Sequence, residues 1–255
     1  MTDIDPGRTF STPSDSPLVP TLPFRFRDVA ILTVAYRTDL EAVRRVLPLP
    51  LEPLDDRVIV HIYQMNDTDW FGAYNESAVQ VSARYPATGE TGAYSPYLYL
   101  DHDGGIAAGR EIYGQPKKFG RPSIEVRQDL LVGTVSRNGI DIITATMPYK
   151  SGASSLAAMT EDLGFVTNFN LKVVPSVTGV DAIRQLTARD LQDLVVHECW
   201  SGPGTVELRP NSQAPVYRLP VREMLTGYFW RCDFTLGYGR VVHDYLAPAH
   251  AGETS

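Results

Sequence analysis

The sequence predicts an α+β fold that is mostly antiparallel β, a sheet or barrel with a few helices packed outside it. Short β-branched and aromatic runs recur along the chain, and 19 prolines and 20 glycines among 255 residues supply many turns. The regular alternation of strands and helices that a doubly wound fold needs is missing, and helices segregate from antiparallel strands in α+β proteins.

One folded domain is expected over residues 23–248, because no internal repeat, charge block or Gly/Ser linker divides the chain. A chain of this length buries enough surface for one large core. Residues 1–22 are acidic, polar and rich in Pro, Ser and Thr, without the basic and apolar regions of a secretory signal, and are predicted to be a flexible N-terminal arm. Residues 249–255 are predicted to be a tail.

The first strand is predicted from Phe24 to Tyr36, where apolar and charged residues alternate before a β-branched run. A short helix is expected next, because Thr38 and Glu41 have the spacing of a capping box and Pro48 ends the helical pattern.

The rest of the chain predicts further strands and one more helix. Asn138-Gly139 between two β-branched runs is the strongest hairpin signal in the sequence. The predicted strands are Val58–Met65, Ala78–Tyr85, Tyr94–Asp101, Leu131–Val135, Ile140–Met147, Phe165–Val174, Leu194–Trp200 and Thr205–Leu208, and the helix is Ser154–Leu163.

Composition excludes several classes of function. A net charge of −7 argues against a nucleic-acid binder, and no apolar run is long enough to span a membrane. Two cysteines, Cys199 and Cys232, cannot build a disulfide scaffold, which favours a reducing cytoplasm. The five histidines lack the spacing of a metal site, and no phosphate loop or nucleophile elbow is present, so neither a metal nor a cofactor is expected.

An adjacent lysine pair, Lys117-Lys118, follows Pro116 and the apolar stretch Gly105–Gly109, which we interpret as an apolar strand. Consecutive side chains in extended backbone point in opposite directions, so one lysine can face a core while the other reaches water. Burial would favour the neutral, nucleophilic amine of the inward lysine. The alternative is a solvated loop pair, since exposed lysines are the rule.

The lysine segment, R-E-x-x-x-x-P-K-K-x-G-x-P, resembles the signature of the acetoacetate decarboxylase family. The resemblance runs from about Pro23 to Leu246. It is also carried by Tyr36-Arg37-Thr38-Asp39, Asn66-Asp67-Thr68, Tyr74-Asn75-Glu76-Ser77, Leu131-Val132-Gly133-Thr134, Thr144-Ala145-Thr146-Met147, His197-Glu198-Cys199-Trp200 and Leu219-Pro220-Val221.

The resemblance implies a β-barrel-like cone with outer helices, often assembled into a homo-oligomer, and a catalytic role for residues 23–248. By position, Lys117 matches the Schiff-base lysine, Lys118 its neighbour, and Glu76 an active-site glutamate that orients or moves a proton. Arg110 and Glu111 match a pair that we expect to hold the loop as an ion pair.

Departures from the family pattern concern the substrate. The family has an arginine where this chain has Val29, a glutamate where it has His61 and an aromatic residue where it has Gln115. We predict His61, Gln115, Arg27 and Tyr113 as substrate-binding residues. Arg27 is included because alternation along a regular strand places it on the same face as Val29.

The resemblance implies a cofactor-independent lyase that forms a Schiff base with a small anionic keto acid. The first hypothesis is decarboxylation of a β-keto acid, acetoacetate or a larger analogue, because a protonated Schiff base withdraws electrons from the neighbouring carbon. A pyruvate-dependent aldolase-dehydratase would use the same lysine, and His61 and Gln115 suit it. A third hypothesis is a non-catalytic ligand-binding protein, which the changes at Val29 and His61 favour and the retained Lys117 and Glu76 oppose.

Overall fold

The computed structural model describes residues 7, 9–164 and 167–247 of the chain, and most of them lie in two β-sheets. The large sheet has eleven strands. In spatial order they are β15 (Arg240–Asp244), β11 (Asp181–Asp190), β10 (Thr167–Pro175), β4 (Glu90–Leu100), β3 (Tyr74–Tyr85), β2 (Glu52–Thr68), β1 (Phe24–Arg37), β14 (Glu223–Leu236), β12 (Gln192–Gly202) and β9 (Gly152–Ala153), with β5 (Lys117–Phe119) paired to β4.

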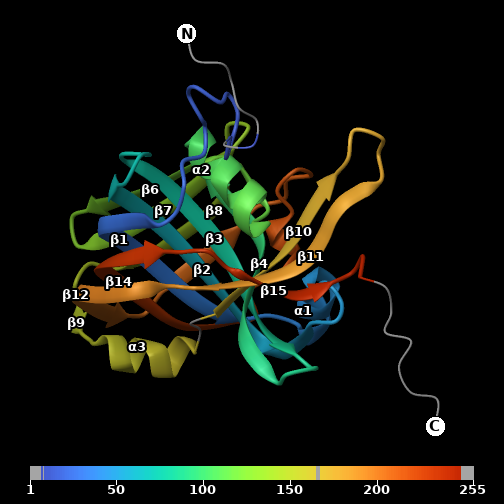
Figure 1. The fold of residues 1–255 in the computed structure, drawn as a ribbon. Coiled ribbons are helices and arrows are strands. Elements are labelled where there is room, and N and C mark those ends of the chain that lie inside the picture. The colour runs from blue at the N-terminus through green and yellow to red at the C-terminus, as the bar shows by residue number, and fades with distance from the viewer. Residues whose placement is uncertain (1–6, 8, 165–166, 248–255) are drawn as a thin grey trace.

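Nearly every strand pair in the large sheet is antiparallel, which confirms the predicted fold class. Strands β1 to β4 form a meander of consecutive neighbours. The exceptions are β5 and β10, which both run parallel to β4. The sheet is strongly curved, as Figure 1 shows, but within the described residues its hydrogen-bonded order ends at β15 and β9 and does not close.

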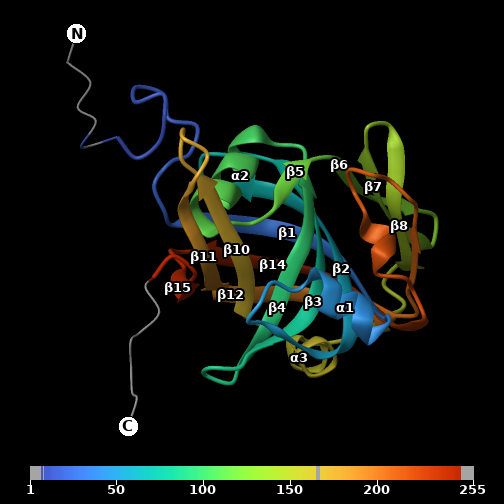
Figure 2. The same cartoon turned by 90° about the vertical axis from the view of Figure 1, so that its right-hand side faces the viewer.

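The small sheet packs as a second layer beside the large one (Figure 2). Its order is β13 (Thr205–Leu208), β8 (Ile140–Pro148), β7 (Leu130–Arg137) and β6 (Arg121–Arg127). The predicted hairpin at Asn138-Gly139 is confirmed: it joins β7 to β8, with φ of 55° and 77° at its two turn residues. Both values lie in the left-handed region that a two-residue hairpin turn requires.

The two faces of the large sheet bury two separate apolar clusters. On β1, Leu32 and Val34 belong to the cluster that includes Leu131 and Ile143 of the small sheet. Ile31 and Ala35 point the other way, into a cluster shared with residues of β14 and the third helix. The second cluster surrounds a cavity, described below.

Within the described ranges, three α-helices lie outside the sheets. They are α1 (Leu40–Val46), α2 (Asp103–Ala108) and α3 (Leu156–Leu163); α2 continues into a π-helical turn, Gly109–Tyr113, and a 3₁₀ turn covers Val216–Arg218. The helix expected near Ser154 is confirmed as α3, with Ser155 as its N-cap. In both ribbon views α2 lies near the top of the molecule and α3 at the bottom, with strands of the large sheet between them (Figures 1 and 2).

Two local predictions were wrong. Asp39, not Thr38, is the N-cap of α1, and no side-chain capping bond forms there, because the Asp39 carboxylate binds Arg222 instead. The apolar stretch Gly105–Gly109 is helical rather than a strand, and the His102 side chain caps its first turn by accepting from the Gly105 amide. Short, glycine-rich helices lack the periodic pattern that identifies longer ones.

The predicted ends of the domain stay a prediction. Within the predicted arm, Val19 is buried in the apolar cluster around the cavity. The tail 249–255 and the start of the strand predicted at Phe165 lie outside the described residues. Among the residues described, no helix is long and apolar enough to cross a membrane.

Candidate active site

A cavity of about 280 Å³ lies on the second face of the large sheet, enclosed by strands from both of its ends and by α2 and α3. This volume is near the lower end of the range for small-molecule sites, about 300–1,000 Å³. Most of the lining is apolar or aromatic; members include Phe26, Ile31, Met65, Leu98, Met159, Trp230 and Phe234. Its ionisable lining consists of His61, Tyr63, Tyr74, Glu76, Tyr113, Lys117 and Arg189.

Lys117 lies in the short strand β5, whose parallel pairing with β4 sets the direction of its side chain. The side chain of Lys117 is 9% exposed and enters the cavity, whereas Lys118 is exposed and donates to the carbonyl oxygen of Gln213. The predicted opposite directions of the two side chains are thus confirmed. Lys118 lies outside the cavity, so its predicted catalytic role finds no support in this geometry.

Glu76 of β3 is the partner of the buried lysine. The Lys117 Nζ donates to Glu76 Oε2 at 2.9 Å, and both side chains are more than nine-tenths buried. An ion pair this well shielded keeps a proton donor and a proton acceptor in contact inside an apolar cavity. Among the cavity-lining residues that the structure describes, these two form the only ion pair.

The segment between α2 and β5 presses against the lysine. A Cβ atom at Gly109 would lie 2.3 Å from Cδ of Lys117, so only glycine leaves room for the extended lysine side chain. Gly114 then reverses the chain with φ of 81°, and the Arg110 guanidinium donates to the Lys117 carbonyl oxygen at 3.4 Å. These contacts position the backbone of Lys117.

Arg110 and Glu111 do not form the expected ion pair in the described structure, because adjacent residues of a helical turn point in different directions. Glu111 instead acts on Lys172, and its charge partly offsets the lowering of the Lys172 pKa by burial. The Lys172 ammonium donates to the Ile112 carbonyl oxygen at 3.1 Å. Arg110 and Glu111 thus act on different partners, and their structural role stays a prediction.

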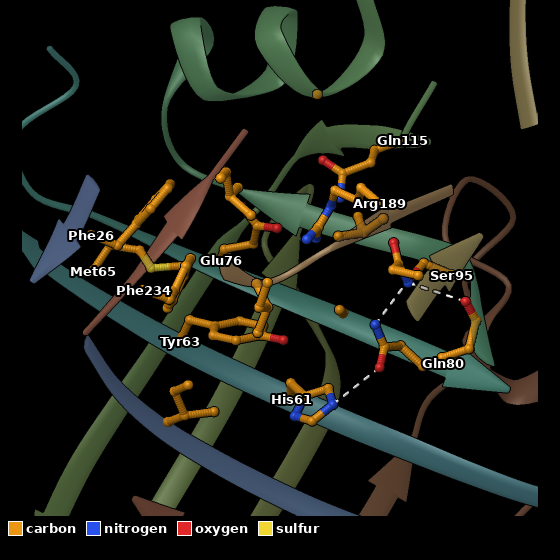
Figure 3. A pocket seen from close by; sticks show the side chains of 18 of the residues that line it. Phe26, His61, Tyr63, Met65, Glu76, Gln80, Ser95, Gln115, Arg189 and Phe234 are labelled. Atoms are coloured by element: carbon orange, nitrogen blue, oxygen red, sulfur yellow. Dashed lines mark hydrogen bonds between the residues drawn. The ribbon is translucent and has the colours of Figure 1, made fainter. Parts of the chain in front are cut away.

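His61 lies in a buried hydrogen-bond network at the cavity wall. Its Nδ1 is 2.9 Å from Thr33 Oγ1 and its Nε2 is 3.2 Å from Gln80 Oε1, and the Gln80 amide donates to Ser95. Figure 3 shows the part of this network that runs from His61 through Gln80 to Ser95. Burial lowers the pKa of His61 to about 4, so the imidazole is neutral at neutral pH. This favours hydrogen bonding over proton donation.

Gln115 and Tyr113 also reach the cavity. Gln115 is buried, and its backbone amide donates to the Gly109 carbonyl oxygen at 2.9 Å. The Tyr113 hydroxyl donates to the Gly237 carbonyl oxygen at 2.9 Å, and burial raises the pKa of this phenol to about 12. Tyr113 is thus held as a neutral ring at the wall.

The prediction that Arg27 reaches the site is wrong. Asp28 adopts φ of 53° and creates a β-bulge between Phe26 and Val29, which reverses the alternation along β1. Arg27 therefore points outward and pairs with Asp67 and Asp69. Val29 is fully buried in the surrounding apolar cluster and does not line the cavity.

Sequence reasoning missed Arg189, the second cation of the cavity. It lies on β11 opposite Asn168 of β10, a strand pair that extends the sheet beyond β4. Its guanidinium lies over the Tyr113 ring, 5.8 Å from the centroid. The alternation in residues 181–190 was the available signal, but nothing in the sequence indicates that this strand borders the lysine.

The fold and site define a mostly antiparallel β protein with a buried lysine–carboxylate pair in a small, largely apolar cavity. In the described residues no three His, Cys, Asp or Glu side chains gather as a candidate metal site. A model of the acetoacetate decarboxylase (ADC) family matches residues 9–246. The chain belongs to this family, and the expected enzyme class, a lyase, is confirmed.

Individual relatives agree with the family. The chain is 39% identical over 239 residues to an acetoacetate decarboxylase of Chromobacterium violaceum, covering 94% of this chain and 96% of the relative. A crystal structure of acetoacetate decarboxylase from Legionella pneumophila superposes with a TM-score of 0.86 at 36% identity, covering 93% and 95% of the two chains. The enduracididine biosynthesis enzyme MppR complexed with pyruvate, at 22% identity and a TM-score of 0.76 over 93% and 98%, shares the fold.

Proposed function

We propose that this chain decarboxylates a small β-keto acid through a Schiff base on Lys117. The observation that carries the proposal is the buried contact of Lys117 Nζ with Glu76 Oε2 inside the cavity. Relatives at 37–40% identity that are named acetoacetate decarboxylase support the same reaction. Acetoacetate is therefore the first substrate to test.

The chemistry begins with proton transfer. Glu76 is the acceptor within hydrogen-bond distance of the Lys117 ammonium, so it takes the proton that the amine must lose. The free amine attacks the ketone carbon, and the oxygen leaves as water once two protons have been added to it. The product is a protonated imine between Lys117 and the substrate.

Loss of carbon dioxide follows from the charge on the imine nitrogen. The bond between the α-carbon and the carboxylate breaks, and its electron pair moves through the carbon skeleton to the nitrogen, which gives carbon dioxide and an enamine. Protonation of the enamine carbon and addition of water release a ketone and regenerate the amine. The apolar walls favour the step, because a carboxylate becomes a neutral molecule there.

Borohydride trapping tests the lysine. We expect reduction in the presence of acetoacetate to leave one covalent adduct by intact mass, and Lys117→Ala to abolish it. Lys150→Ala is the matched control, because Lys150 lies outside the cavity and pairs with Glu198. Lys118→Ala tests the other predicted lysine, and we expect the adduct to persist. An adduct that survives Lys117→Ala would refute the proposal.

A product assay separates the two lysine chemistries. We expect carbon dioxide release from acetoacetate and no conjugated product from pyruvate plus an aldehyde. The opposite pattern would identify an aldolase-dehydratase instead. A chain that binds acetoacetate but forms neither product nor adduct would be a ligand-binding protein.

We also propose a homo-oligomer in the cytoplasm. The tip of the β10–β11 hairpin, which extends away from the sheet in Figure 1, exposes the side chains of Val177 and Val180 fully or largely. Such residues suit burial against a second copy of the chain. Cys199 and Cys232 are free and buried, as suits a reducing compartment. Light scattering of the native chain and of Val177→Lys tests the assembly; a monomeric native chain would overturn it.

A further inference from the structure

We propose that Arg189 binds the carboxylate of the substrate and is the residue that selects keto acids over neutral ketones. This inference rests on the proposed function, because it assigns a role in the same cavity. It starts from charge. Two basic side chains line the cavity: Lys117, which is paired with the carboxylate of Glu76, and Arg189. The fourth ionisable side chain of this group, His61, is neutral. One positive charge is therefore left for an anionic ligand.

Arg189 is the cation without a partner. Its guanidinium forms no hydrogen bond or ion pair with any residue that the structure describes, and its Nε is buried without an acceptor. Most other arginines that the structure describes, such as Arg27 and Arg184, pair with carboxylates. A buried N–H group without an acceptor destabilises the protein, and a ligand that accepts a hydrogen bond from it would remove that cost.

The residues around Arg189 orient its guanidinium toward the cavity. The ring of Tyr113 lies beside it at 5.8 Å, and that ring is fixed by the hydrogen bond from its hydroxyl to Gly237. An aromatic face orients a cation without neutralising its charge. Figure 3 shows Arg189, Gln115 and Glu76 directed into the same part of the cavity.

A carboxylate suits this arrangement better than a ketone oxygen. The guanidinium presents Nε–H and a neighbouring N–H in a planar fork that matches the two oxygens of a carboxylate. A neutral ketone offers one weaker acceptor and would leave the positive charge uncompensated. Tyr113 is thus a positioning residue that acts through Arg189, and Arg189 contacts the substrate.

Because the contact is made to a carboxylate that departs as neutral carbon dioxide, it is strongest before the reaction. Binding that is stronger in the ground state than in the transition state lowers KM and does not raise kcat. We therefore expect Arg189→Met to raise KM for acetoacetate by about 10- to 100-fold, the effect of losing a charge-assisted pair, with a smaller change in kcat. Arg189→Lys keeps the positive charge but loses the planar pair of N–H donors, so its KM should lie between those of the native protein and Arg189→Met.

The experiment compares an acid with a neutral ketone. With Lys117→Ala added to prevent turnover, the native sequence, Arg189→Met, Arg189→Lys and Arg184→Met are titrated calorimetrically with acetoacetate. With Lys117 retained, each is trapped with borohydride in the presence of acetone. Arg184 lies on the same strand but is exposed and paired with Asp181, so Arg184→Met is the matched control. We expect Arg189→Met to lose acetoacetate affinity while acetone still labels Lys117 at the native rate.

Two results would overturn the inference. Unchanged acetoacetate affinity in Arg189→Met would show that another group holds the carboxylate. Equal losses with acetoacetate and acetone would show a structural role for Arg189. Calorimetry detects carboxylate binding whether or not an imine forms. If acetone failed to label even the native protein, that result would count against the Schiff base, and the calorimetric test of Arg189 would still be valid.

Discussion

The protonation of one buried side chain gives a pH-dependent stability. The folded pKa of His61, about 4, lies below its ordinary value of 6.5 because the ring is buried. Between these values the unfolded chain binds a proton on this residue and the folded chain does not. The free energy of unfolding therefore falls as pH falls through this window, by up to about 3 kcal/mol from this residue alone.

His61→Gln removes that proton-binding site. We expect the slope of unfolding free energy against pH between 6.5 and 4 to be shallower in the variant than in the native chain, whatever the offset at pH 7. Urea unfolding at a series of pH values measures both slopes. His243→Gln, at a half-buried position on the edge strand β15, is the control. Parallel slopes in native protein and His61→Gln would show that the imidazole is not held neutral.

Residue-level prediction from the sequence succeeded where a single local rule decides the outcome. Alternation in extended backbone predicted that Lys117 and Lys118 diverge, and they do. The same rule failed for Arg27, because Asp28 has a left-handed backbone conformation that creates a β-bulge. No pattern in the sequence predicts this bulge. Arg189 was missed because its importance depends on which distant residues lie beside it.

At the level of elements, the turn from α2 into β5 controls the reactive amine. Gly109 has helical angles, φ of −61° and ψ of −45°, so alanine fits its backbone, and alanine favours helix by about 1 kcal/mol. The obstacle is the Lys117 side chain, whose Cδ and Cε would lie 2.3 and 2.7 Å from the new methyl group. A flexible side chain moves more easily than the backbone.

We therefore expect Gly109→Ala to fold with nearly native stability yet to lose activity, by at least about tenfold, because the amine moves away from Glu76 and from the substrate. Adduct formation with acetone should slow to a similar degree. Thermal unfolding checks the predicted stability, and borohydride trapping on the same sample checks the predicted loss of lysine reactivity. A variant that is severely destabilised, or fully active, would contradict this view of the turn.

Element prediction followed the strength of the local pattern. Long alternating strands such as β1 and the Asn138-Gly139 hairpin were identified from sequence because period and turn residues agree. Helix α2 has six residues with two adjacent glycines, and β11 has only three consecutive buried positions. Both gain their stability from packing against the rest of the fold, so neither has a strong signal of its own.

For the whole molecule, the cavity depends on pairings between distant parts of the chain. Phe26 faces Phe234 across β1 and β14, and Asn168 pairs with Ala93 across β10 and β4. The meander β1 to β4 joins near neighbours instead. Closing long loops costs entropy before the contacts form, so the walls of the cavity should be completed after the meander.

Refolding from denaturant tests that order. We expect far-ultraviolet circular dichroism to recover before the ability to bind acetoacetate, which is measured on samples taken during refolding. The Arg184→Met variant should show the same delay, since it alters no cavity contact. Simultaneous recovery of both signals would show that the whole sheet forms in one step.

The edge of β4 opposite β3 is shared end to end by two parallel partners. Ala93 and Tyr94 pair with β10, and Leu98 to Leu100 pair with β5. One partner carries Lys117 and the other leads through β11 to Arg189. The segment of β4 from Tyr94 to Leu98, four residue steps or about 13 Å of strand, therefore sets the distance between Lys117 and the strand pair that carries Arg189. We expect an insertion of two residues in this segment, matched by two residues in the paired segment of β3, to move Arg189 away from Lys117 and to favour longer keto acids.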